Sequence, residues 1–414
     1  MKAVVFDLTI PRYLLAKGFG RLTSSVTFGG LSGLRLAEVS APAIPAPDWV
    51  RLEVLLCGIC GTDIGNLVFS SSPVLEPFGS FPAVLGHEIL ARVTEVGSAV
   101  TRVETGQRVA VEPTLSCRVR GYKDYQCPSC AAGLHATCEQ AGEEGPLEVG
   151  SRPISSGLTI GYHRDLPGGW GEQIIAHESQ LFPLPSELED REAVLIEPLS
   201  IGVHAVLKAP PHPDEPVLVI GSGPIAMATI WTLRALGFGG DLIAQAKRER
   251  EIELATRLGA TDVVRPGLEA RQSLVDTGSM AYQPLVGPEV YSGGGFPLIY
   301  DCVGSAESLD QAIRFVSPRG RIIMLGCSAQ VRKLDLTFLW ARELEIKGFM
   351  GYGREVWEGE ERHTFEITRE LLVRSPVPTD RMVTHLFPLD QYRYALKAAA
   401  NRRRSGAMKV VLQP

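Results

Sequence analysis

The pattern of hydrophobic and polar residues changes about halfway along the chain. In residues 1 to about 203, short apolar runs alternate with turns rich in glycine and proline, and the runs at 50–56 and 172–176 are typical of strands. The N-terminal residues 1–7 read as another short strand, interrupted by an acid. The first half is therefore predicted to be a β-rich domain.

From residue 204 to about 350, apolar strands alternate with helices. Strands are predicted at 217–220, 242–244, 297–300 and 321–325, and helices at 224–236, 248–258 and 305–315. This alternation predicts a parallel, doubly wound sheet, so the fold class is α/β. Residues 351–414 return to a mixed pattern and end in an apolar run at 408–412, which we expect to rejoin the first domain as a strand.

Two segments, 8–35 and 267–295, show no pattern typical of a compact element, and we interpret them as insertions or loops. A chain of 414 residues exceeds the usual size of one hydrophobic core. We therefore predict domains at 1–203 and 204–350, with 351–414 returning to the first.

Charge and cysteine content narrow the class of partner. A net charge of −6 argues against nucleic acid or an anionic membrane, and the run Arg402–Arg404 is interpreted as solvated surface. The N-terminus lacks the apolar core of a signal peptide. We therefore expect a cytoplasmic protein with eight reduced cysteines, for which metal binding is a better default than disulfide formation.

Cys60, His87 and Glu197 supply a thiolate, an imidazole and a carboxylate. A catalytic zinc needs three such ligands and one position open to substrate, and Glu88 could serve as a fourth ligand that comes and goes. The alternative for His87 alone is a core histidine beside a buried cysteine. Together, the four residues predict an open zinc site.

Two residues beside Cys60 suit supporting roles at that site. Asp63 could accept a hydrogen bond from the far ring nitrogen of His87 and so fix its tautomer. Thr62 offers a hydroxyl that could bond an alcohol at the zinc and pass its proton outward.

A second cluster of cysteines lies at Cys117, Cys127, Cys130 and Cys138. Four thiolates so close together predict a closed structural zinc site. Asp124 could replace Cys117 as a ligand, and a redox-active Cys-x-x-Cys pair is a further alternative that lacks the usual βα context. The remaining Cys57, Cys302 and Cys327 are predicted to be packing residues.

A glycine turn follows the strand at 217–220. Gly221 permits the tight turn, Gly223 lets a pyrophosphate approach the backbone, and Ala226 keeps helix and strand close. The predicted cofactor contacts are Gly221, Ser222, Gly223, Pro224, Ile225 and Ala226, joined by Ala246, Lys247 and Arg248 after the next strand and by Val303.

The end of the second strand distinguishes NAD from NADP. An NAD enzyme places an acid there to bind the ribose 2′-hydroxyl. This chain has Gln245 and Ala246, then Lys247 and Arg248, whereas Asp241 lies at the start of the strand. We predict NADP(H) as the preferred cofactor, with NAD(H) as an alternative; the two cations could instead be the solvated start of a helix.

These motifs together resemble the zinc-dependent medium-chain dehydrogenase/reductase family of alcohol, polyol, threonine and glucose dehydrogenases. The resemblance rests on the motifs at 57–63, 86–88, 168–172, 197–199 and 221–223 and on the cysteine loop. It implies a GroES-like catalytic domain, a Rossmann domain, an active site in the cleft between them and a homodimer or homotetramer. Glu197, where another branch carries cysteine, resembles the polyol, sugar and threonine group.

Three features depart from the family pattern. Gly65 occupies the position of a proton-relay histidine, so water or another group must complete the relay. The spacing from Cys117 to Cys127 is longer than usual, and residues 8–35 are an N-terminal elaboration that could line the substrate cleft.

The predicted activity is hydride transfer between an alcohol held at zinc and NAD(P), with carbonyl reduction in the reverse direction. Two alternatives are a zinc-independent enone or quinone reductase on the same fold and a non-catalytic NADP-binding sensor. The predicted partner is a small alcohol or carbonyl compound, which the sequence does not identify further.

Overall fold

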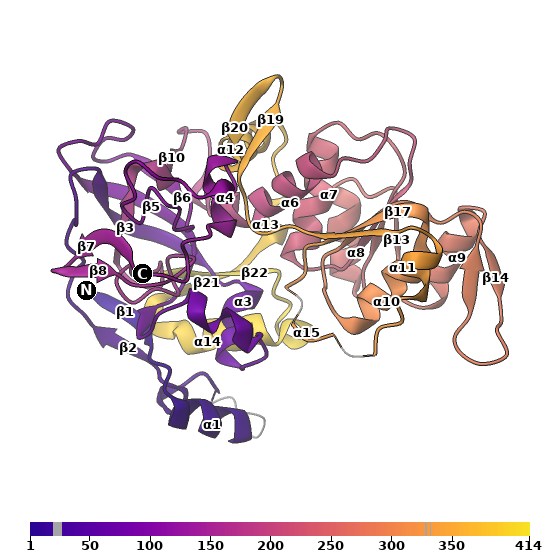
Figure 1. Ribbon diagram of the computed structural model, residues 1–414, viewed down its shortest axis with the longest axis horizontal. Coiled ribbons are helices and arrows are strands. Elements are labelled where there is room, and N and C mark those ends of the chain that lie inside the picture. The colour runs from indigo at the N-terminus through magenta and orange to yellow at the C-terminus, as the bar shows by residue number, and fades with distance from the viewer. Residues whose placement is uncertain (20–26, 328, 332) are drawn as a thin grey trace.

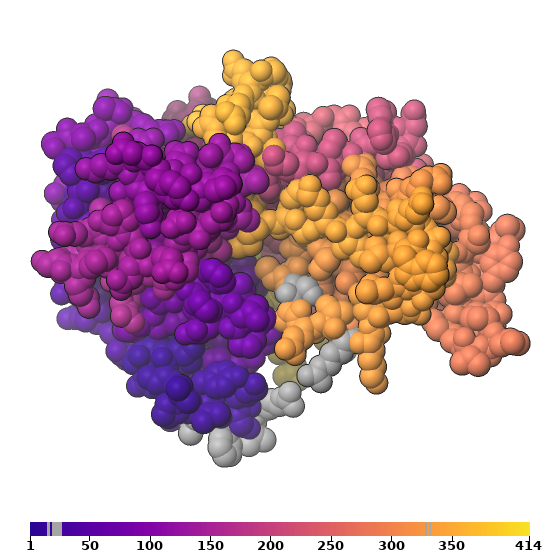
Figure 2. Space-filling view, viewed as in Figure 1, coloured from indigo at the N-terminus to yellow at the C-terminus, as the bar shows by residue number. Residues whose placement is uncertain are grey.

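The computed structural model describes residues 1–19, 27–327, 329–331 and 333–414. The chain forms two domains that lie side by side, one β-rich and one built on a parallel sheet (Figure 1). A groove separates them on the face shown in Figure 2. This arrangement confirms the predicted fold class.

The first domain contains two main sheets. β2 (Leu34–Glu38), β1 (Lys2–Phe6) and β4 (Ala83–Val84) form a three-stranded sheet in that order. A seven-stranded sheet has the order β10-β6-β5-β3-β22-β21, with β9 also paired to β3. Its strands are β3 (Trp49–Gly58), β5 (Glu88–Val96), β6 (Arg108–Val111), β9 (Gln173–His177), β10 (Leu181–Pro183), β21 (Val383–Pro388) and β22 (Lys409–Gln413). The strands predicted at 1–7, 50–56 and 172–176 are therefore confirmed as β1, β3 and β9.

The C-terminal strand returns to this domain, as predicted. In β22, Leu412 pairs antiparallel with Cys57 of β3, while the other edge of β22 runs parallel to β21. Val410, Val411 and Leu412 are buried because β22 lies inside the sheet, whose apolar face packs around Trp49 and Trp170. Burial of this apolar run is what attaches the end of the chain to the beginning.

The second domain is a six-stranded parallel sheet in the order β13-β12-β11-β16-β17-β18. Its strands are β11 (Val217–Ile220), β12 (Leu242–Gln245), β13 (Asp262–Val264), β16 (Phe296–Asp301), β17 (Val316–Met324) and β18 (Glu345–Gly348), and its helices include α7 (Pro224–Ala235), α8 (Glu249–Arg257) and α10 (Ala306–Phe315). The strand order reverses at the β11–β16 neighbours, and ligands bind at such a switch point in a Rossmann sheet. The domain boundary predicted after residue 203 falls inside α6 (Ile196–Lys208).

The two segments predicted to lack compact elements contain several. Residues 8–35 include α1 (Ile10–Phe19), η1 (Gly30–Ser32) and the start of β2. Residues 267–295 hold α9 (Leu268–Asp276) and a hairpin of β14 (Met280–Tyr282) and β15 (Val290–Ser292). The prediction was wrong because few apolar positions hold these elements: in α9 only Ala270 and Leu274 are buried. Such weak amphipathic signals are hard to distinguish from a loop.

The remaining chain links the domains. The hairpin of β19 (Arg354–Trp357) and β20 (Glu360–His363) leads into α12 (Thr364–Arg374), which packs on α6 (Figure 1). Smaller elements are β7 (Gly145–Val149), β8 (Arg152–Ile154), α11 (Thr337–Ala341), α13 (Thr379–Met382), α14 (Tyr392–Ala400) and α15 (Arg402–Ser405). Among the described residues, no helix has the length and apolar character needed to cross a membrane.

Candidate active site and metal centres

Cys60 lies at the start of a short helix, α3 (Gly61–Leu67), that follows β3. The backbone N–H of Cys60 donates to Asp63 Oδ2 at 2.8 Å. The Asp63 side chain is fully buried, so this bond fixes the turn that presents Cys60 and Thr62.

His87 and Glu88 lie where the chain passes from β4 into β5. Gly86 adopts a φ of +95°, and a Cβ there would lie 2.2 Å from Cδ1 of the buried Trp170. Only glycine combines this backbone conformation with such close packing. On the opposite strand, a Cβ at Gly58 would overlap Glu88 Oε2 at 1.8 Å, so Gly58 leaves the space that the carboxylate occupies.

The four predicted zinc ligands do not lie equally close to one another. Ligand atoms of Cys60, His87 and Glu88 lie within 4.8 Å of one another. Glu197, near the start of α6, is outside this group, and its Oε1 accepts a hydrogen bond from Tyr352 at 2.7 Å. Among the described residues, Glu88 therefore occupies the inner position that the sequence favoured for Glu197.

The charges of this site suit a divalent cation. Glu88 Oε2 and Glu197 Oε2 are buried and lack a hydrogen-bond partner among the described residues. Burial and the nearby charge of Glu88 raise the pKa of Glu197 to about 7. The buried ammonium of Lys409 contacts Glu88 Oε1 at 2.5 Å. A bound Zn²⁺ would give the unpartnered carboxylate oxygens a cation, and the donor set fits it.

The carboxylate of Asp63 lies close to both Tyr162 and His87. The phenol oxygen of Tyr162 lies 2.5 Å from Asp63 Oδ1 and 3.3 Å from Thr62 Oγ1. His87 Nδ1 lies 3.5 Å from the same Asp63 oxygen and has no hydrogen-bond partner among the described residues. The predicted Asp63–His87 contact is therefore present as a close approach, and Tyr162 holds the shorter one.

Sequence reasoning missed three residues of this site. A signal existed for Lys409, the one charged residue in the apolar run that ends the chain, because a buried lysine needs a partner. Tyr162 and Tyr352 carried no comparable signal. They reach the site from a loop and from the segment before β19, and only the fold brings these segments together.

The four predicted cysteines of the second site converge. Cys117, Cys127, Cys130 and Cys138 are all buried with their sulfurs grouped, and the Sγ atoms of Cys117 and Cys138 are 3.7 Å apart. That separation matches the edge of a tetrahedron of thiolates about 2.3 Å from a zinc ion. Asp124 is exposed and outside the group, so Cys117 rather than Asp124 lies with the other three cysteines.

Of the three cysteines assigned to packing, Cys57 is buried and Cys302 is half-buried, whereas Cys327 is exposed. The packing prediction is therefore wrong for Cys327, which follows β17 in a loop rather than ending inside the strand.

The glycine turn lies between β11 and α7, as its sequence context predicted. Gly221 has a φ of +122°, and a Cβ there would lie 3.0 Å from Val303 Cγ2, which places Val303 against the turn. Ala226 is fully buried where α7 crosses the sheet. The first turn of α7, which starts at Pro224 with Ile225 next to it, leaves backbone N–H groups free for a pyrophosphate.

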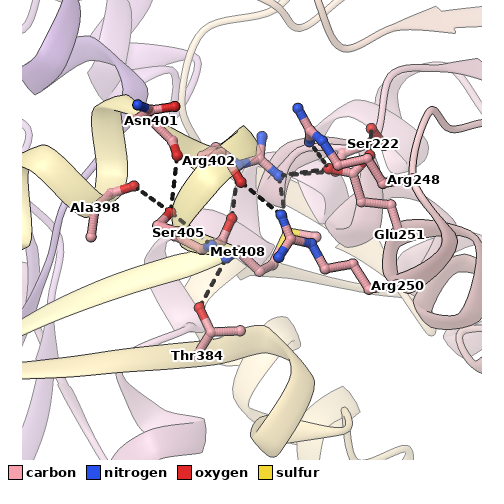
Figure 3. A network of polar contacts seen from close by, with 11 residues as sticks. Ser222, Arg248, Arg250, Glu251, Thr384, Ala398, Asn401, Arg402, Ser405 and Met408 are labelled. Carbon is pink, nitrogen blue, oxygen red and sulfur yellow. Dashed lines mark hydrogen bonds and ion pairs between the residues drawn. The ribbon is translucent and has the colours of Figure 1, made fainter.

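Arg402 reaches this turn from the C-terminal segment (Figure 3). Its Nη2 donates to Ser222 O at 3.2 Å, and Arg250 Nη2 donates to Arg402 O at 2.6 Å. Arg402 is half-buried, whereas Arg403 and Arg404 are exposed. The interpretation of all three arginines as solvated surface is therefore wrong for Arg402, because α15 folds back onto the second domain.

The cations after β12 differ in their surroundings. Arg248 pairs with the buried carboxylate of Glu251, whose Oε2 accepts from Ser222 Oγ at 2.7 Å. Lys247 is exposed, and Ala246 is buried with its N–H bonded to Val264 O. Lys247 is thus the more available cation for a phosphate at this edge.

A third group of ligand-type residues joins three parts of the chain. Glu112 follows β6, His135 lies in the cysteine lobe and His363 ends β20. His363 Nδ1 accepts the N–H of Phe365, which leaves the ring hydrogen on Nε2, 3.3 Å from Glu112 Oε2. We interpret the group as a cluster of close carboxylate–imidazole contacts, because a metal on Nε2 would require the other tautomer.

The fold and the sites define a class of protein: a metal-site oxidoreductase in which a β-rich domain faces a Rossmann sheet. Residues 46–186 match the alcohol dehydrogenase GroES-like domain family, and residues 224–365 match the zinc-binding dehydrogenase family. The chain belongs to the zinc-dependent medium-chain dehydrogenase family, as the motifs indicated. It is an oxidoreductase with a nicotinamide cofactor.

Known proteins resemble the chain over nearly its whole length. L-idonate 5-dehydrogenase of Vitis vinifera is 26% identical over 382 residues, which cover 92% of each chain. Sorbitol dehydrogenase of Arabidopsis thaliana is 26% identical and covers 92% of this chain and 93% of its own. A zinc-binding dehydrogenase of Sinorhizobium meliloti, solved with NADP bound, is 25% identical with a TM-score of 0.71 and covers 100% of this chain and 99% of its own.

Replacing Cys117 tests the ligand set of the cysteine lobe. Cys117→Ser should lower zinc content by one ion per chain and lower Tm by about 5–10 °C, because a lost structural metal costs a few kcal/mol and each shifts Tm by about 2–4 °C. Metal analysis and calorimetry measure both. Asp124→Ala is the matched control and should change neither; loss of zinc in Asp124→Ala with retention in Cys117→Ser would reverse the assignment.

The Glu112 cluster should make stability depend on pH. Burial opposes ionisation, yet His363 and His135 together hold the pKa of Glu112 well below its usual range. Burial also opposes protonation of His135, but Glu112 raises its pKa. The carboxylate contributes stability above about pH 4.3 and loses it as the pH falls, whereas His135 contributes below about pH 6.5 and loses it as the pH rises through its raised value.

The Tm difference between wild type and Glu112→Gln should therefore be largest between about pH 4.5 and 6.5 and smaller at pH 8. Scanning calorimetry across this range measures it. Glu144→Gln, which removes an exposed carboxylate from the same lobe, is the control. A difference that is constant with pH would contradict the cluster.

Proposed function

We propose that the chain is a zinc-dependent polyol-type dehydrogenase that prefers NADP. The observation that carries this proposal is the buried group of Cys60, His87 and Glu88 with unpartnered carboxylate oxygens beside it. It belongs to a chain whose second domain offers a dinucleotide turn at its switch point. A metal that binds an alcohol and a cofactor that accepts hydride are the two requirements of the reaction.

Cys60, His87 and Glu88 would hold the zinc, and Glu197 would face it as an additional carboxylate. When bound, zinc lowers the pKa of an alcohol ligand through its positive charge. Thr62 Oγ1 would accept a hydrogen bond from the alcohol and pass its proton outward, and Asp63 holds the turn that carries Thr62. Lys409 holds Glu88 in place through their buried ion pair.

The substrate class rests on two supports. The carboxylate at Glu197 resembles the polyol branch of the family, and the relatives from Vitis vinifera and Arabidopsis thaliana are named for L-idonate and sorbitol. A polyhydroxy compound also suits a site rich in acceptors, because each further hydroxyl can donate to a carboxylate such as Glu197.

The NADP preference rests on the edge of β12. No acid follows that strand before Lys247, and Lys247 is exposed and available to a 2′-phosphate. The first turn of α8 carries two acids: Glu251, whose oxygens contact Ser222 and Arg248, and the exposed Glu249, which pairs with Arg265. A relative that is 25% identical was solved with NADP bound.

Turnover on a panel of alcohols tests the reaction. Zinc-replete protein should reduce NADP with at least one polyol, aldose, primary alcohol or β-hydroxy amino acid, as read by nicotinamide absorbance. Cys60→Ser should abolish turnover while NADPH binding, measured by fluorescence, survives. Near-normal turnover of zinc-free Cys60→Ser protein would instead support a zinc-independent reductase.

Lys247→Ala tests the cofactor preference. It should raise the KM for NADP about tenfold, the loss of about 1.4 kcal/mol of charge-assisted binding, and leave the KM for NAD unchanged. Arg257→Ala removes an equal charge from the exposed far end of α8 and is the control. Equal effects on both cofactors, or equal effects of both variants, would count against a 2′-phosphate site at Lys247.

A further inference from the structure

One guanidinium nitrogen of Arg402 lies beside the glycine turn. A Cβ on Gly223 would lie 3.2 Å from Arg402 Nη1, which is the only heavy atom of the described residues, chain neighbours aside, within 4 Å of that point. The second glycine of a dinucleotide turn lacks a side chain so that the pyrophosphate can approach the backbone. Arg402 Nη1 therefore lies on the side of Gly223 that the phosphates would approach. We propose that Arg402 binds the pyrophosphate of the cofactor, an inference that rests on the proposed function for its ligand.

The other contacts of the guanidinium leave this nitrogen available. Arg402 Nε donates to Ala407 O at 3.0 Å, and Nη2 donates to Ser222 O at 3.2 Å. Within the described part of the chain, Nη1 makes no hydrogen bond, and 30% of the side chain is exposed. The guanidinium is thus fixed by two of its nitrogens while the third is free. Its planar fork suits phosphate oxygens, and a side chain that is already held loses little conformational entropy on binding.

The backbone around Arg402 is also held in place (Figure 3). The carbonyl oxygen of Arg402 accepts the N–H of Gly406 at 3.1 Å and Arg250 Nη2 at 2.6 Å. Gly406 has a φ of +82°, and a Cβ there would lie 2.1 Å from Arg250 Nη1, so the close contact requires glycine. Ser405 Oγ donates to Ala398 O at 2.8 Å, which ties α15 to the end of α14. These bonds fix the direction in which the Arg402 side chain leaves α15.

The charges of this network favour an anion. Figure 3 shows three arginines, Arg248, Arg250 and Arg402, around the single carboxylate of Glu251. Glu251 pairs with Arg248, and its Oε1 lies 3.7 Å from Arg402 Nη2. Because one carboxylate cannot offset three guanidinium groups, the network has positive charge left over at the glycine turn. A pyrophosphate, which is negatively charged, would offset that charge.

The proposed contact would come from the first domain. Arg402 opens α15, which follows α14, and α14 packs on β22 and on α3. Helix α3 starts immediately after Cys60 of the metal site. Arg402 would therefore hold the pyrophosphate from the domain that carries the metal site, while the glycine turn holds it from the other domain.

Two competing roles give different results on removal of the guanidinium. In a purely structural role, the bond from Arg402 Nη2 to Ser222 O would tie α15 to the glycine turn whether or not a cofactor is bound. Loss of that tie would weaken every ligand of the second domain, whereas loss of a phosphate contact weakens only ligands that contain the pyrophosphate. In a blocking role, the guanidinium would occupy the phosphate position, and its removal would strengthen binding.

The test is titration calorimetry of the full-length, zinc-replete protein with NADPH, NADH, adenosine 5′-diphosphate and adenosine 2′-monophosphate. The 5′-diphosphate contains a pyrophosphate and no 2′-phosphate, and the 2′-monophosphate has the reverse. Arg402→Gln removes the charge and keeps a donor for Ser222 O. It should raise the Kd for NADPH, NADH and the 5′-diphosphate about tenfold, the loss of a charge-assisted hydrogen bond, and leave the Kd for the 2′-monophosphate within about twofold. Lys247→Ala should weaken the 2′-monophosphate and leave the 5′-diphosphate unchanged.

Arg403→Gln is the matched control, because it makes the same change at the neighbouring arginine of α15, which is exposed. It should leave all four Kd values unchanged. Arg402→Lys keeps the positive charge and should bind the 5′-diphosphate more tightly than Arg402→Gln does. In Arg402→Gln, an unchanged or lower Kd for the 5′-diphosphate, or equal weakening of the 5′-diphosphate and the 2′-monophosphate, would overturn the pyrophosphate contact. A lysine variant no better than the glutamine variant would overturn it as well.

Because these titrations need no turnover, they separate this inference from the proposed function. If wild type oxidises no alcohol on the panel but the four Kd values follow the expected pattern, the dehydrogenase proposal fails and the pyrophosphate contact stands. If wild type oxidises an alcohol but Arg402→Gln binds the 5′-diphosphate as wild type does, the pyrophosphate contact fails and the dehydrogenase proposal stands.

Discussion

The buried ion pair between Lys409 and Glu88 is the interaction on which the active site depends. Both side chains are almost fully excluded from solvent, and their charged atoms are 2.5 Å apart. Such burial is unfavourable unless each charge has partners, and the ammonium is the partner of Glu88 Oε1. Glu88 Oε2 and Glu197 Oε2 lack a hydrogen-bond partner among the described residues, so both oxygens could face a bound cation.

The same ion pair joins the end of the chain to its first domain. Lys409 belongs to β22, which pairs with the first domain after the chain has passed through the second. On the way back, the C-terminal third supplies Tyr352 to Glu197 and Arg402 to the glycine turn. The metal site and the dinucleotide turn are therefore both completed by residues far from their motifs, and these contacts couple the two sides of the groove.

Asp63 adds a second fixed point beside Cys60. Its Oδ2 accepts the Cys60 N–H, and its Oδ1 accepts the hydroxyl of Tyr162, which also lies 3.3 Å from Thr62 Oγ1. The turn that carries Cys60 and Thr62 is therefore held by a contact with a distant loop, whereas Glu88 is held by Lys409 of the C-terminal strand.

The sequence by itself determined the two-domain α/β fold, the family and most candidate site residues, because these depend on local patterns. Alternating runs predict β11, β12, β16 and β17, and glycines beside His87 and at Gly221 mark places where the backbone must come close to other groups. Weakly amphipathic elements such as α1 and α9 were missed, since few buried positions distinguish them from loops. Only the tertiary structure decided that Glu88 rather than Glu197 lies with Cys60 and His87, that Arg402 leaves the surface, and that Tyr162 faces Asp63. These are contacts between segments far apart in sequence, and no local pattern records which segments meet.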